Sequence, residues 1–243
     1  MDAVISALER QGELTAAELA EALGGPLSSM YRMLQSLEAV GWVDRSPRRG
    51  RYRLGLPMMT IGGLVEDSID IRELARPGLM TLLQETEATS FLCVPRGARA
   101  VCIERLEGRA VRSLAMQLGS SLPLYAGAAP RALLAHLPLS EQRDVLESGV
   151  VMPGDPPRPA VAATLRELEE VRRRGYAVSD GDVTSGIAAL GAPVFNHRQE
   201  LVASMSISGL RHQILGPNLE RNGALLQHAA RATSAALGDE SAS

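Results

Sequence analysis

The short segment Gly24-Gly25-Pro26 restricts the fold of this chain more than any other feature, because it separates two short helical patterns. Two glycines followed by a proline favour a turn over a continuous helix. Thr15 and Glu18 precede the turn with the spacing of a capping box, which satisfies free amides at the start of a helix. After the turn, Ser28 or Ser29 can cap a further helix. The expected inward residues of that helix are Met30, Met33, Leu34 and Leu37.

An arginine-rich hairpin is expected after these helices. Trp42-Val43 and Tyr52-Arg53-Leu54 have the character of two short strands. The nine residues from Arg45 to Arg53 include five arginines. An earlier helix is expected to begin with Asp2 as its cap. Three helices followed by a hairpin form a winged helix-turn-helix, which we place at residues 1–56.

The exposed residues of the second helix in a helix-turn-helix must hydrogen-bond to bases, because that helix lies in the major groove. Arg32 can bind guanine through two hydrogen bonds, and Gln35 can bind adenine in the same way. Nearby hydroxyl groups and the hairpin arginines suit phosphate contacts. The formal net charge is −3, so binding would depend on this local patch, and a merely solvated surface is the alternative. The residues expected to contact DNA are Thr15, Ser28, Ser29, Tyr31, Arg32, Gln35, Arg48, Arg49 and Arg51.

The remainder of the chain has the pattern of a second, mixed domain, which makes the whole an α+β protein. A helical pattern begins at Pro57 and is interrupted near Asp70, which predicts a linker helix over residues 57–70 and a second domain over residues 71–238. Strand and helix patterns alternate there, so we expect an α/β domain with an antiparallel sheet. The expected strands are Ser90–Val94, Ala100–Leu106, Val111–Leu114, Tyr176–Ser179, Ile187–Phe195 and Leu201–Ser208. The expected helices are Pro130–His136, Ser140–Glu147, Ala160–Arg174 and Asn218–Leu237.

The two cysteines, Cys93 and Cys102, lie on either side of a turn signal at residues 95–98. We expect them to be cross-strand neighbours in a hairpin and to remain thiols. A redox switch or a role in metal binding is the alternative interpretation of this pair.

The sequence offers little for catalysis. It contains no nucleophile elbow, no phosphate-binding glycine loop and no paired-histidine zinc motif, and its four histidines are scattered. Asp180 and Asp182 could form a paired-carboxylate site, although a polar turn is an equally good interpretation. We therefore expect no catalytic residue, no metal and no cofactor.

The N-terminal residues pass at once into a polar helical pattern, without the charged and apolar regions of a secretory signal. No stretch approaches the roughly 20 apolar residues that a membrane span needs. These two features predict a cytoplasmic protein with no membrane partner.

Motifs along nearly the whole chain resemble those of the IclR family of bacterial regulators. In the first domain they are Leu14-Thr15, Glu18-Leu19-Ala20, the run from Pro26 to Leu34, and Tyr52-Arg53-Leu54-Gly55. In the second domain they are Leu122-Pro123-Leu124-Tyr125-Ala126, Arg131-Ala132-Leu133-Leu134-Ala135, Arg174-Gly175-Tyr176-Ala177, Gly186-Ile187-Ala188, Ala192-Pro193-Val194-Phe195 and Ser206-Ile207-Ser208-Gly209. The resemblance implies a GAF-like second domain with a six-stranded sheet, a small-molecule pocket on that sheet, and a homodimer or a dimer of dimers.

The resemblance also implies where an effector binds. The family's effector positions fall on Ala128, Ala129, Ser179, Ile187, Ala189, Ser206 and Ser208. Where an acid is common in the family, this chain has Ser179 followed by Asp180, so Asp180 is a further candidate.

Ser206 and Ser208 are two residues apart on an expected strand, so their hydroxyls point to one face of the sheet. There they could bind a carboxylate or carbonyl oxygen, unless that face is the solvent side of an edge strand. We therefore predict a sequence-specific regulator whose affinity for double-stranded operator DNA depends on a small organic effector, such as an acid or an aromatic catabolite. The alternatives are a DNA-binding module whose second domain only oligomerises and a metabolite-processing enzyme.

Overall fold

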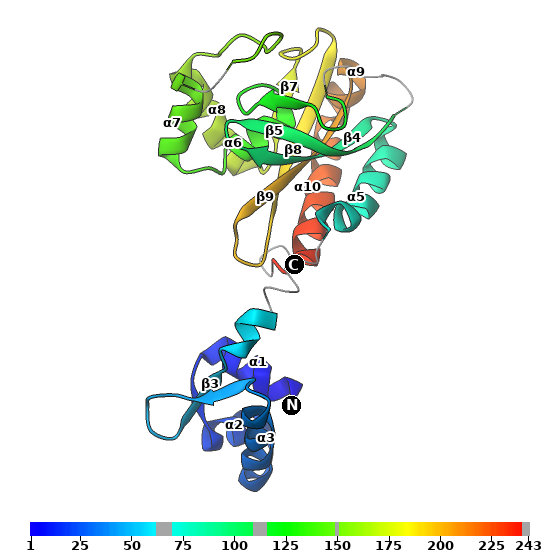
Figure 1. Cartoon of the computed structure of the whole chain (residues 1–243). Helices are drawn as coiled ribbons and strands as arrows, with labels where there is room; N and C mark the ends of the chain where they lie inside the picture. The colour runs from blue at the N-terminus through cyan, green and yellow to red at the C-terminus, as the bar shows by residue number, and fades with distance from the viewer. Residues whose placement is uncertain (62–69, 109–115, 149–150, 240–243) are drawn as a thin grey trace. The chain divides into compact units, whose positions relative to one another are not determined.

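The computed structural model describes residues 1–61, 70–108, 116–148 and 151–239 of the chain. These residues form two compact units, Met1–Ile69 and Asp70–Ser243, which are taken in turn below (Figure 1).

The N-terminal unit is a winged helix-turn-helix, as predicted. Its helices are α1 (Asp2–Gln11), α2 (Ala16–Leu23) and α3 (Leu27–Ala39). Its antiparallel sheet has the order β1-β3-β2, with β1 (Leu14–Thr15), β2 (Val43–Arg45) and β3 (Arg51–Leu54). The apolar faces of the three helices meet in one core, in which Leu8, Leu19, Leu34 and Leu37 are almost completely buried. The wing is the hairpin of β2 and β3.

The capping box of α2 is present as predicted. The Thr15 hydroxyl accepts a hydrogen bond from the Glu18 amide (3.2 Å), and a Glu18 carboxylate oxygen accepts one from the Thr15 amide (2.7 Å). Gly24 then ends α2 in the left-handed region at φ 65°, which glycine adopts without a steric penalty.

The predicted caps of the other two helices are wrong. The N-cap of α3 is Pro26 in an extended conformation, and its carbonyl accepts from the amides of Ser29 and Met30. The helix therefore begins before Ser28 and Ser29, whose hydroxyls make no cap. Likewise Met1, and not Asp2, is the N-cap of α1. Asp2 lies inside the first turn, where its negative charge suits the helix dipole.

Residues 57–61, where the linker helix is expected to begin, are helical. The rest of the expected linker, residues 62–69, lies outside the described residues. Helix α5 (Ile71–Thr86) follows, and its N-cap is Asp70, whose carboxylate accepts from the Arg72 amide at 2.9 Å.

The C-terminal unit is built on a six-stranded antiparallel sheet with the order β6-β5-β4-β9-β8-β7. Its strands are β4 (Thr89–Arg96), β5 (Arg99–Leu106), β6 (Ser121–Pro123), β7 (Ala177–Asp180), β8 (Ile187–Phe195) and β9 (Leu201–Leu210). The long middle strands β4, β9 and β8 carry most of the pairing. The antiparallel sheet with helices on both faces gives the GAF-like α/β architecture that the sequence predicts.

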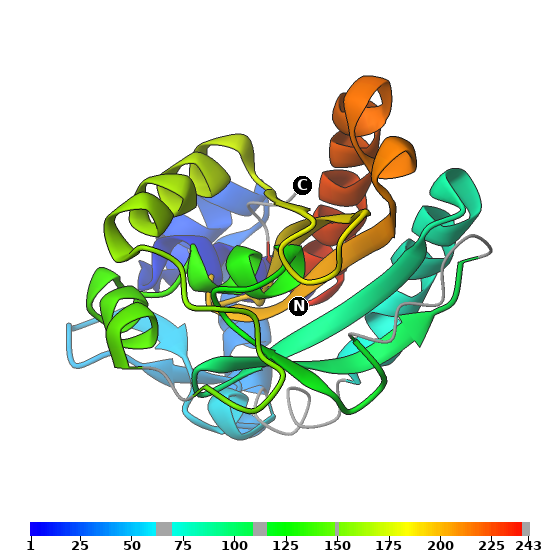
Figure 2. The ribbon, with the colours of Figure 1, turned by 90° about the horizontal axis from the view of Figure 1, so that it is seen from above.

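Helices cover both faces of this sheet (Figure 2). On one face, α5 and α10 (Leu219–Ala236) pack against Leu92, Leu190 and Met205. On the other face lie α6 (Ala128–Leu134), α7 (Leu139–Ser148) and α8 (Val161–Arg174), which pack with Phe91 and Cys93. Because side chains alternate along a strand, Leu92 and its neighbours Phe91 and Cys93 belong to opposite cores.

Most of the predicted elements of this unit are present. The strand Ile187–Phe195 has the predicted bounds, and Gly175 ends α8 at φ 83° as a C-cap glycine. Three short elements were not predicted, namely β6, α9 (Arg211–Ile214) and η1 (Gly216–Asn218). The strand predicted at Val111–Leu114 lies outside the described residues.

Cys93 and Cys102 are direct cross-strand partners in the hairpin of β4 and β5, as predicted, and both are buried free thiols. The hydrogen bond with Cys102, together with burial, raises the pKa of the Cys93 thiol well above its ordinary value. Cys93 therefore stays protonated and packs as a small apolar residue.

Candidate nucleic-acid interface and pocket

One side of α3 is polar and open to solvent. Ser28, Tyr31, Arg32 and Gln35 are exposed, while Met30, Leu34 and Leu37 turn inward. An Arg32 guanidinium nitrogen lies 3.4 Å from the Ser29 hydroxyl, which is a weak contact that leaves its other N–H groups available. Tyr31 is 49% exposed and lies on the same polar side of the helix.

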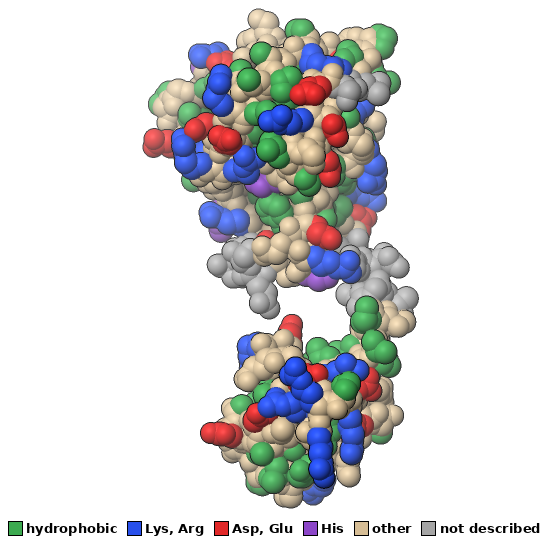
Figure 3. All heavy atoms as spheres, turned by 90° about the vertical axis from the view of Figure 1, so that its left-hand side faces the viewer, with side chains coloured by type: hydrophobic (Ala, Val, Ile, Leu, Met, Phe, Trp, Pro, Cys, Tyr) green, Lys and Arg blue, Asp and Glu red, His purple; other side chains and the backbone are tan. Residues whose placement is uncertain are grey.

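The wing contributes arginines that differ in what they already bind. Arg45 pairs with Glu38 (2.9 Å), and Arg48 lies 3.8 Å from a Glu13 carboxylate oxygen. Arg49 and Arg53 are exposed and form no ion pair within the described part of the chain. Figure 3 shows basic side chains gathered on the face of the N-terminal unit that it presents.

Arg51 is tied into the unit itself. Its guanidinium donates to the Glu18 carboxylate (3.0 Å) and to the Glu13 carbonyl (2.7 Å), and the side chain is 33% exposed. The hydrogen bond from the Thr15 amide, reinforced by Arg51, lowers the pKa of Glu18. The arrangement therefore fixes a negative carboxylate and a positive guanidinium between the wing and α2.

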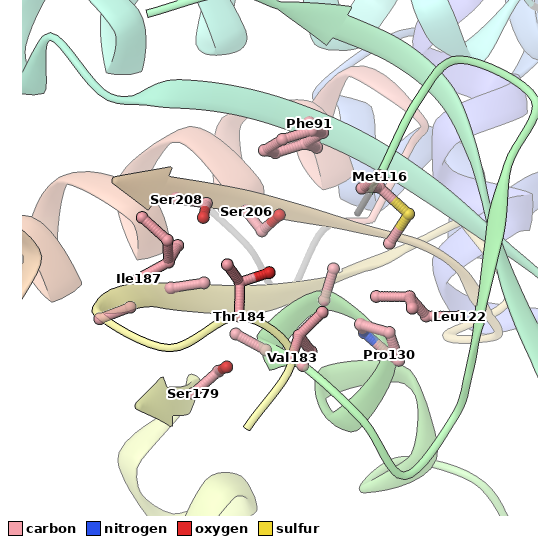
Figure 4. Close-up of a pocket in the computed structure, with 15 residues that line it drawn as sticks. Phe91, Met116, Leu122, Pro130, Ser179, Val183, Thr184, Ile187, Ser206 and Ser208 are labelled. Atoms are coloured by element: carbon pink, nitrogen blue, oxygen red, sulfur yellow. The ribbon is translucent and has the colours of Figure 1, made fainter. Parts of the chain in front are cut away.

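A pocket that encloses about 60 Å³ and opens to solvent at its mouth lies on the α6 side of the C-terminal sheet. Its walls come from strands β4, β8 and β9, the start of α6 and the loop between β7 and β8 (Figure 4). A concave site with a mainly apolar lining and a few polar groups suits a small organic molecule. The residues that line it are Phe91, Met116, Leu122, Gly127, Ala128, Ala129, Pro130, Ser179, Val183, Thr184, Ile187, Ala188, Ala189, Ser206 and Ser208.

Strand register explains where the floor of the pocket comes from. Ser179 pairs with Ala189, and Ala189 pairs with Ser208, so these three residues form one row across β7, β8 and β9. Gly191 and Ser206 form part of the next row. A Cβ atom at Gly191 would lie 2.5 Å from the Ala128 carbonyl carbon, so glycine is required for α6 to start directly above β8. Small residues in both rows thus leave the space that the pocket occupies.

The structure brings together in this pocket all but one of the predicted effector residues. Asp180 lies outside it, with its carboxylate 2.8 Å from the Arg211 Nε. Ser179 faces the pocket, so strand alternation turns Asp180 to the opposite side. The acid near the pocket is Asp182, and the Asp180–Asp182 pair therefore forms no shared carboxylate site.

Asp182 connects the loop between β7 and β8 to the start of α6 and to Ser179. One of its carboxylate oxygens accepts from the Gly127 amide (3.1 Å) and from an Arg131 guanidinium nitrogen (2.8 Å). Its other oxygen accepts the hydroxyl proton of Ser179. Arg131 also pairs with Glu167 at 2.8 Å.

In contrast, the Ser206 and Ser208 hydroxyls have no partner in the described part of the chain, and both point into the pocket in Figure 4.

Several lining residues were missed from the sequence, notably Phe91, Met116, Leu122, Val183 and Thr184. Phe91 enters the pocket because it pairs with Ser206 between strands that are far apart in the chain. No local signal marks such a pairing. For Thr184 the sequence does carry a signal, since this residue closely follows Asp180 and Asp182 in a polar segment.

Within the described residues, no cluster of three or more His, Cys, Asp or Glu side chains could hold a metal ion. His136 packs edge-on against the Phe195 ring, and the other three histidines are exposed on separate segments. In the same residues, no helix is long and apolar enough to span a membrane.

Comparison with known proteins gives matches to both units. Residues 3–47 match the IclR helix-turn-helix domain, and residues 64–235 match the family described as bacterial transcriptional regulator IclR C-terminal. The HTH-type transcriptional regulator KipR of Bacillus subtilis is 34% identical over 213 residues, which cover 85% of this chain and 83% of KipR. The HTH-type transcriptional regulator XynR of Escherichia coli is 31% identical over 231 residues, which cover 95% of this chain and 92% of XynR.

Solved structures of other proteins also align with both units of this chain. The crystal structure of Pseudomonas aeruginosa HmgR aligns with a TM-score of 0.80 at 26% identity, over 98% of this chain and 96% of HmgR. That of Thermotoga maritima IclR aligns with a TM-score of 0.63 at 29% identity, over 93% of this chain and 92% of its own length. The likeness therefore extends over both units of the chain.

Proposed function

The chain belongs to the IclR family of bacterial transcriptional regulators, and from this premise we propose which of its residues bind DNA and which bind the effector. The relatives are HTH-type transcriptional regulators and repressors. The chain is accordingly a DNA-binding regulator with a C-terminal effector domain, and not an enzyme. The domain limits that we propose are residues 1–56 for DNA binding, 57–70 for the linker and 71–238 for the effector domain.

We propose that α3 reads bases in the major groove through Arg32 and Gln35. Ser28, Ser29, Tyr31 and Thr15 flank them and would contact the sugar-phosphate backbone, together with the wing. The observation that supports this is the division of α3 into a buried apolar side and an exposed side of hydrogen-bonding residues. One such helix reads only a half-site, so we propose that the chain binds a palindrome as a homodimer or a dimer of dimers.

We propose that the effector occupies the pocket beneath α6. The observation that carries this proposal is that Ala128, Ala129, Ser179, Ile187, Ala189, Ser206 and Ser208, which the family resemblance singles out, line a single cavity. Its two unpartnered serine hydroxyls suit the oxygen atoms of a small organic acid, and its apolar walls suit an aliphatic or aromatic core. Asp180 is left out of these contacts because it pairs with Arg211.

Regulation then follows from linkage. An effector changes DNA affinity only if it binds the DNA-competent arrangement of the dimer with a different affinity from the other arrangement. A regulator of this kind acts on bacterial DNA, so we propose that it works in the cytoplasm.

The test uses the full chain. Operator fragments are first selected from random double-stranded DNA, and footprinting on them should show paired protection of half-sites about 10 base pairs apart or a multiple of that. Small carboxylic and aromatic acids are then titrated into the complex, and at least one should change the DNA affinity. An unpaired half-site bound at full affinity would contradict the dimer, and a second domain that only oligomerises predicts that no acid acts.

A further inference from the structure

The Ser179 hydroxyl differs from the other hydroxyls of the effector pocket in how its proton is used. Asp182 is held between the Arg131 guanidinium (2.8 Å) and the Gly127 amide (3.1 Å), both of which donate to it. An ionised carboxylate can only accept, so the hydrogen bond between Ser179 and Asp182 must use the serine proton. Ser179 is also buried. Because its proton is used by Asp182, its oxygen offers only lone pairs to a molecule in the pocket.

Ser206 and Ser208 present the opposite chemistry. Their hydroxyls have no partner in the described part of the chain, so each can still donate a proton to a ligand oxygen. They lie across the pocket floor from Ser179. The Cα atoms of Ser179 and Ser208 are two strand spacings apart, about 10 Å, with Ala189 between them.

From this polarity we infer that the effector is a small molecule with a hydroxyl or amine at one end and a carbonyl or carboxylate oxygen at the other. The hydroxyl or amine donates to Ser179, and the oxygen accepts from Ser206 and Ser208. The core between them is mainly apolar, because Phe91, Met116 and Val183 face it, and Thr184 adds one further hydroxyl to the lining. This inference rests on the proposed function, since it names the ligand class of the same pocket.

Matched probes separate the two ends of the ligand. The proton-donating probes are 4-hydroxybenzoate and 4-aminobenzoate, and their counterparts are benzoate, which lacks the group, and 4-formylbenzoate, which only accepts. The pair 5-hydroxypentanoate and pentanoate repeats the comparison on an aliphatic core. Dissociation constants are measured by calorimetry on the full chain. The donating member of each set should bind about 5- to 20-fold more tightly, the usual effect of one hydrogen bond in a buried site.

Two variants test the assignment of the proton. Ser179→Ala should reduce binding of 4-hydroxybenzoate to the level of benzoate. Asp182→Asn should reverse the preference, because the side-chain oxygen is held by Gly127 and Arg131 and the amide group then faces Ser179 as a donor. Ser179 would accept from that amide and donate its own proton into the pocket. 4-Formylbenzoate should then bind more tightly than 4-hydroxybenzoate, a reversal that structural damage would not produce.

The possible results distinguish this inference from the proposed function. If benzoate or 4-formylbenzoate binds wild type as tightly as 4-hydroxybenzoate, and Ser206→Ala weakens that binding, the pocket is the effector site but the inferred ligand class is wrong. An unchanged preference in Asp182→Asn also overturns the inference. If no probe of either core binds the chain or alters its DNA affinity, both the ligand class and the placement of the effector fail.

Discussion

The Arg51 guanidinium lies 3.0 Å from the same Glu18 carboxylate that closes the capping box of α2. One acidic side chain thus fixes both the start of the helix that precedes α3 and the position of the wing. Arg51 was predicted from the sequence as a phosphate contact. Its two bonds to Glu18 and Glu13 instead support a role in positioning the wing, while Arg49 and Arg53 remain available to phosphate.

Replacing Arg49 with alanine should weaken binding to all DNA sequences alike, because a phosphate contact carries no base information. The plot of log K against log salt should become less steep by about one unit for the lost contact. Binding isotherms of wild type and variant over a series of salt concentrations measure this slope. Arg221→Ala, which removes an exposed arginine of the C-terminal unit, is the matched control and should leave the slope unchanged.

Arg51→Ala should behave differently. The variant loses a partly exposed ion pair, which should contribute little, and the hydrogen bond to the Glu13 carbonyl, whose loss should make the N-terminal unit less stable by about 1 kcal/mol. DNA affinity should fall because the wing is less well held, with a salt slope close to that of wild type. Denaturant unfolding and the same salt series provide both readouts. If the slope of log K against log salt falls by one full unit and the stability is unchanged, Arg51 contacts a phosphate instead.

Arg32→Ala should relax base preference at one position of each half-site, at a cost of about 1 to 3 kcal/mol for the preferred base. The reason is that a guanidinium forms two hydrogen bonds with guanine and with no other base. Affinities for operators that carry each base pair at each position provide the measurement. A uniform loss over all operators would place Arg32 on phosphate instead.

The double variant Ser206→Ala, Ser208→Ala should bind an identified effector about 5- to 150-fold more weakly, since a buried ligand oxygen loses its hydrogen bonds. DNA affinity without effector should be unchanged, because the two serines belong to the C-terminal unit. Calorimetry and operator binding measure the two quantities. Equal effector affinity in wild type and variant would mean that the pocket lies elsewhere.

His136 should make the protein less stable as the pH falls below about 6.5. Burial, with a smaller effect of Arg172, lowers the pKa of His136 from its ordinary value of 6.5. Protons then bind the unfolded chain first, so the stability that is fully present above pH 6.5 declines as the pH drops toward the folded-state pKa. His136→Gln should unfold with a flatter pH dependence between pH 7 and 5.5. An identical dependence in both proteins would assign the effect to other groups.

The sequence alone was sufficient to predict those features that depend on residues close together in the chain. The Thr15–Glu18 capping box needs only two residues three apart, and the Cys93–Cys102 pairing needs only a turn between two strands. Ser28 and Ser29 were a weaker basis for a cap, since Pro26 was already extended and its carbonyl could begin α3 earlier.

The pocket shows what local patterns cannot predict. Strand periodicity correctly put Ser206 and Ser208 on one face, but which acid bonds to Ser179 depends on the exact bounds of β7 and on the loop that returns Asp182 toward α6. Phe91 becomes a neighbour of Ser206 only through the pairing of β4 with β9. Such strand pairings are determined by the packing of the whole sheet, and the sequence of either strand alone does not predict them.

Ala189 lies at the centre of the row that joins Ser179 to Ser208, and its side chain is a single methyl group that lines the pocket between them. This position bears no hydroxyl, and it belongs to no element that faces DNA. In the effector site that we propose, the side chain at this position should limit the size of the molecule that fits. Valine or leucine at position 189 should narrow the range of effectors that bind while leaving operator recognition intact. A library at this one position is the natural starting point for retuning the protein as a biosensor.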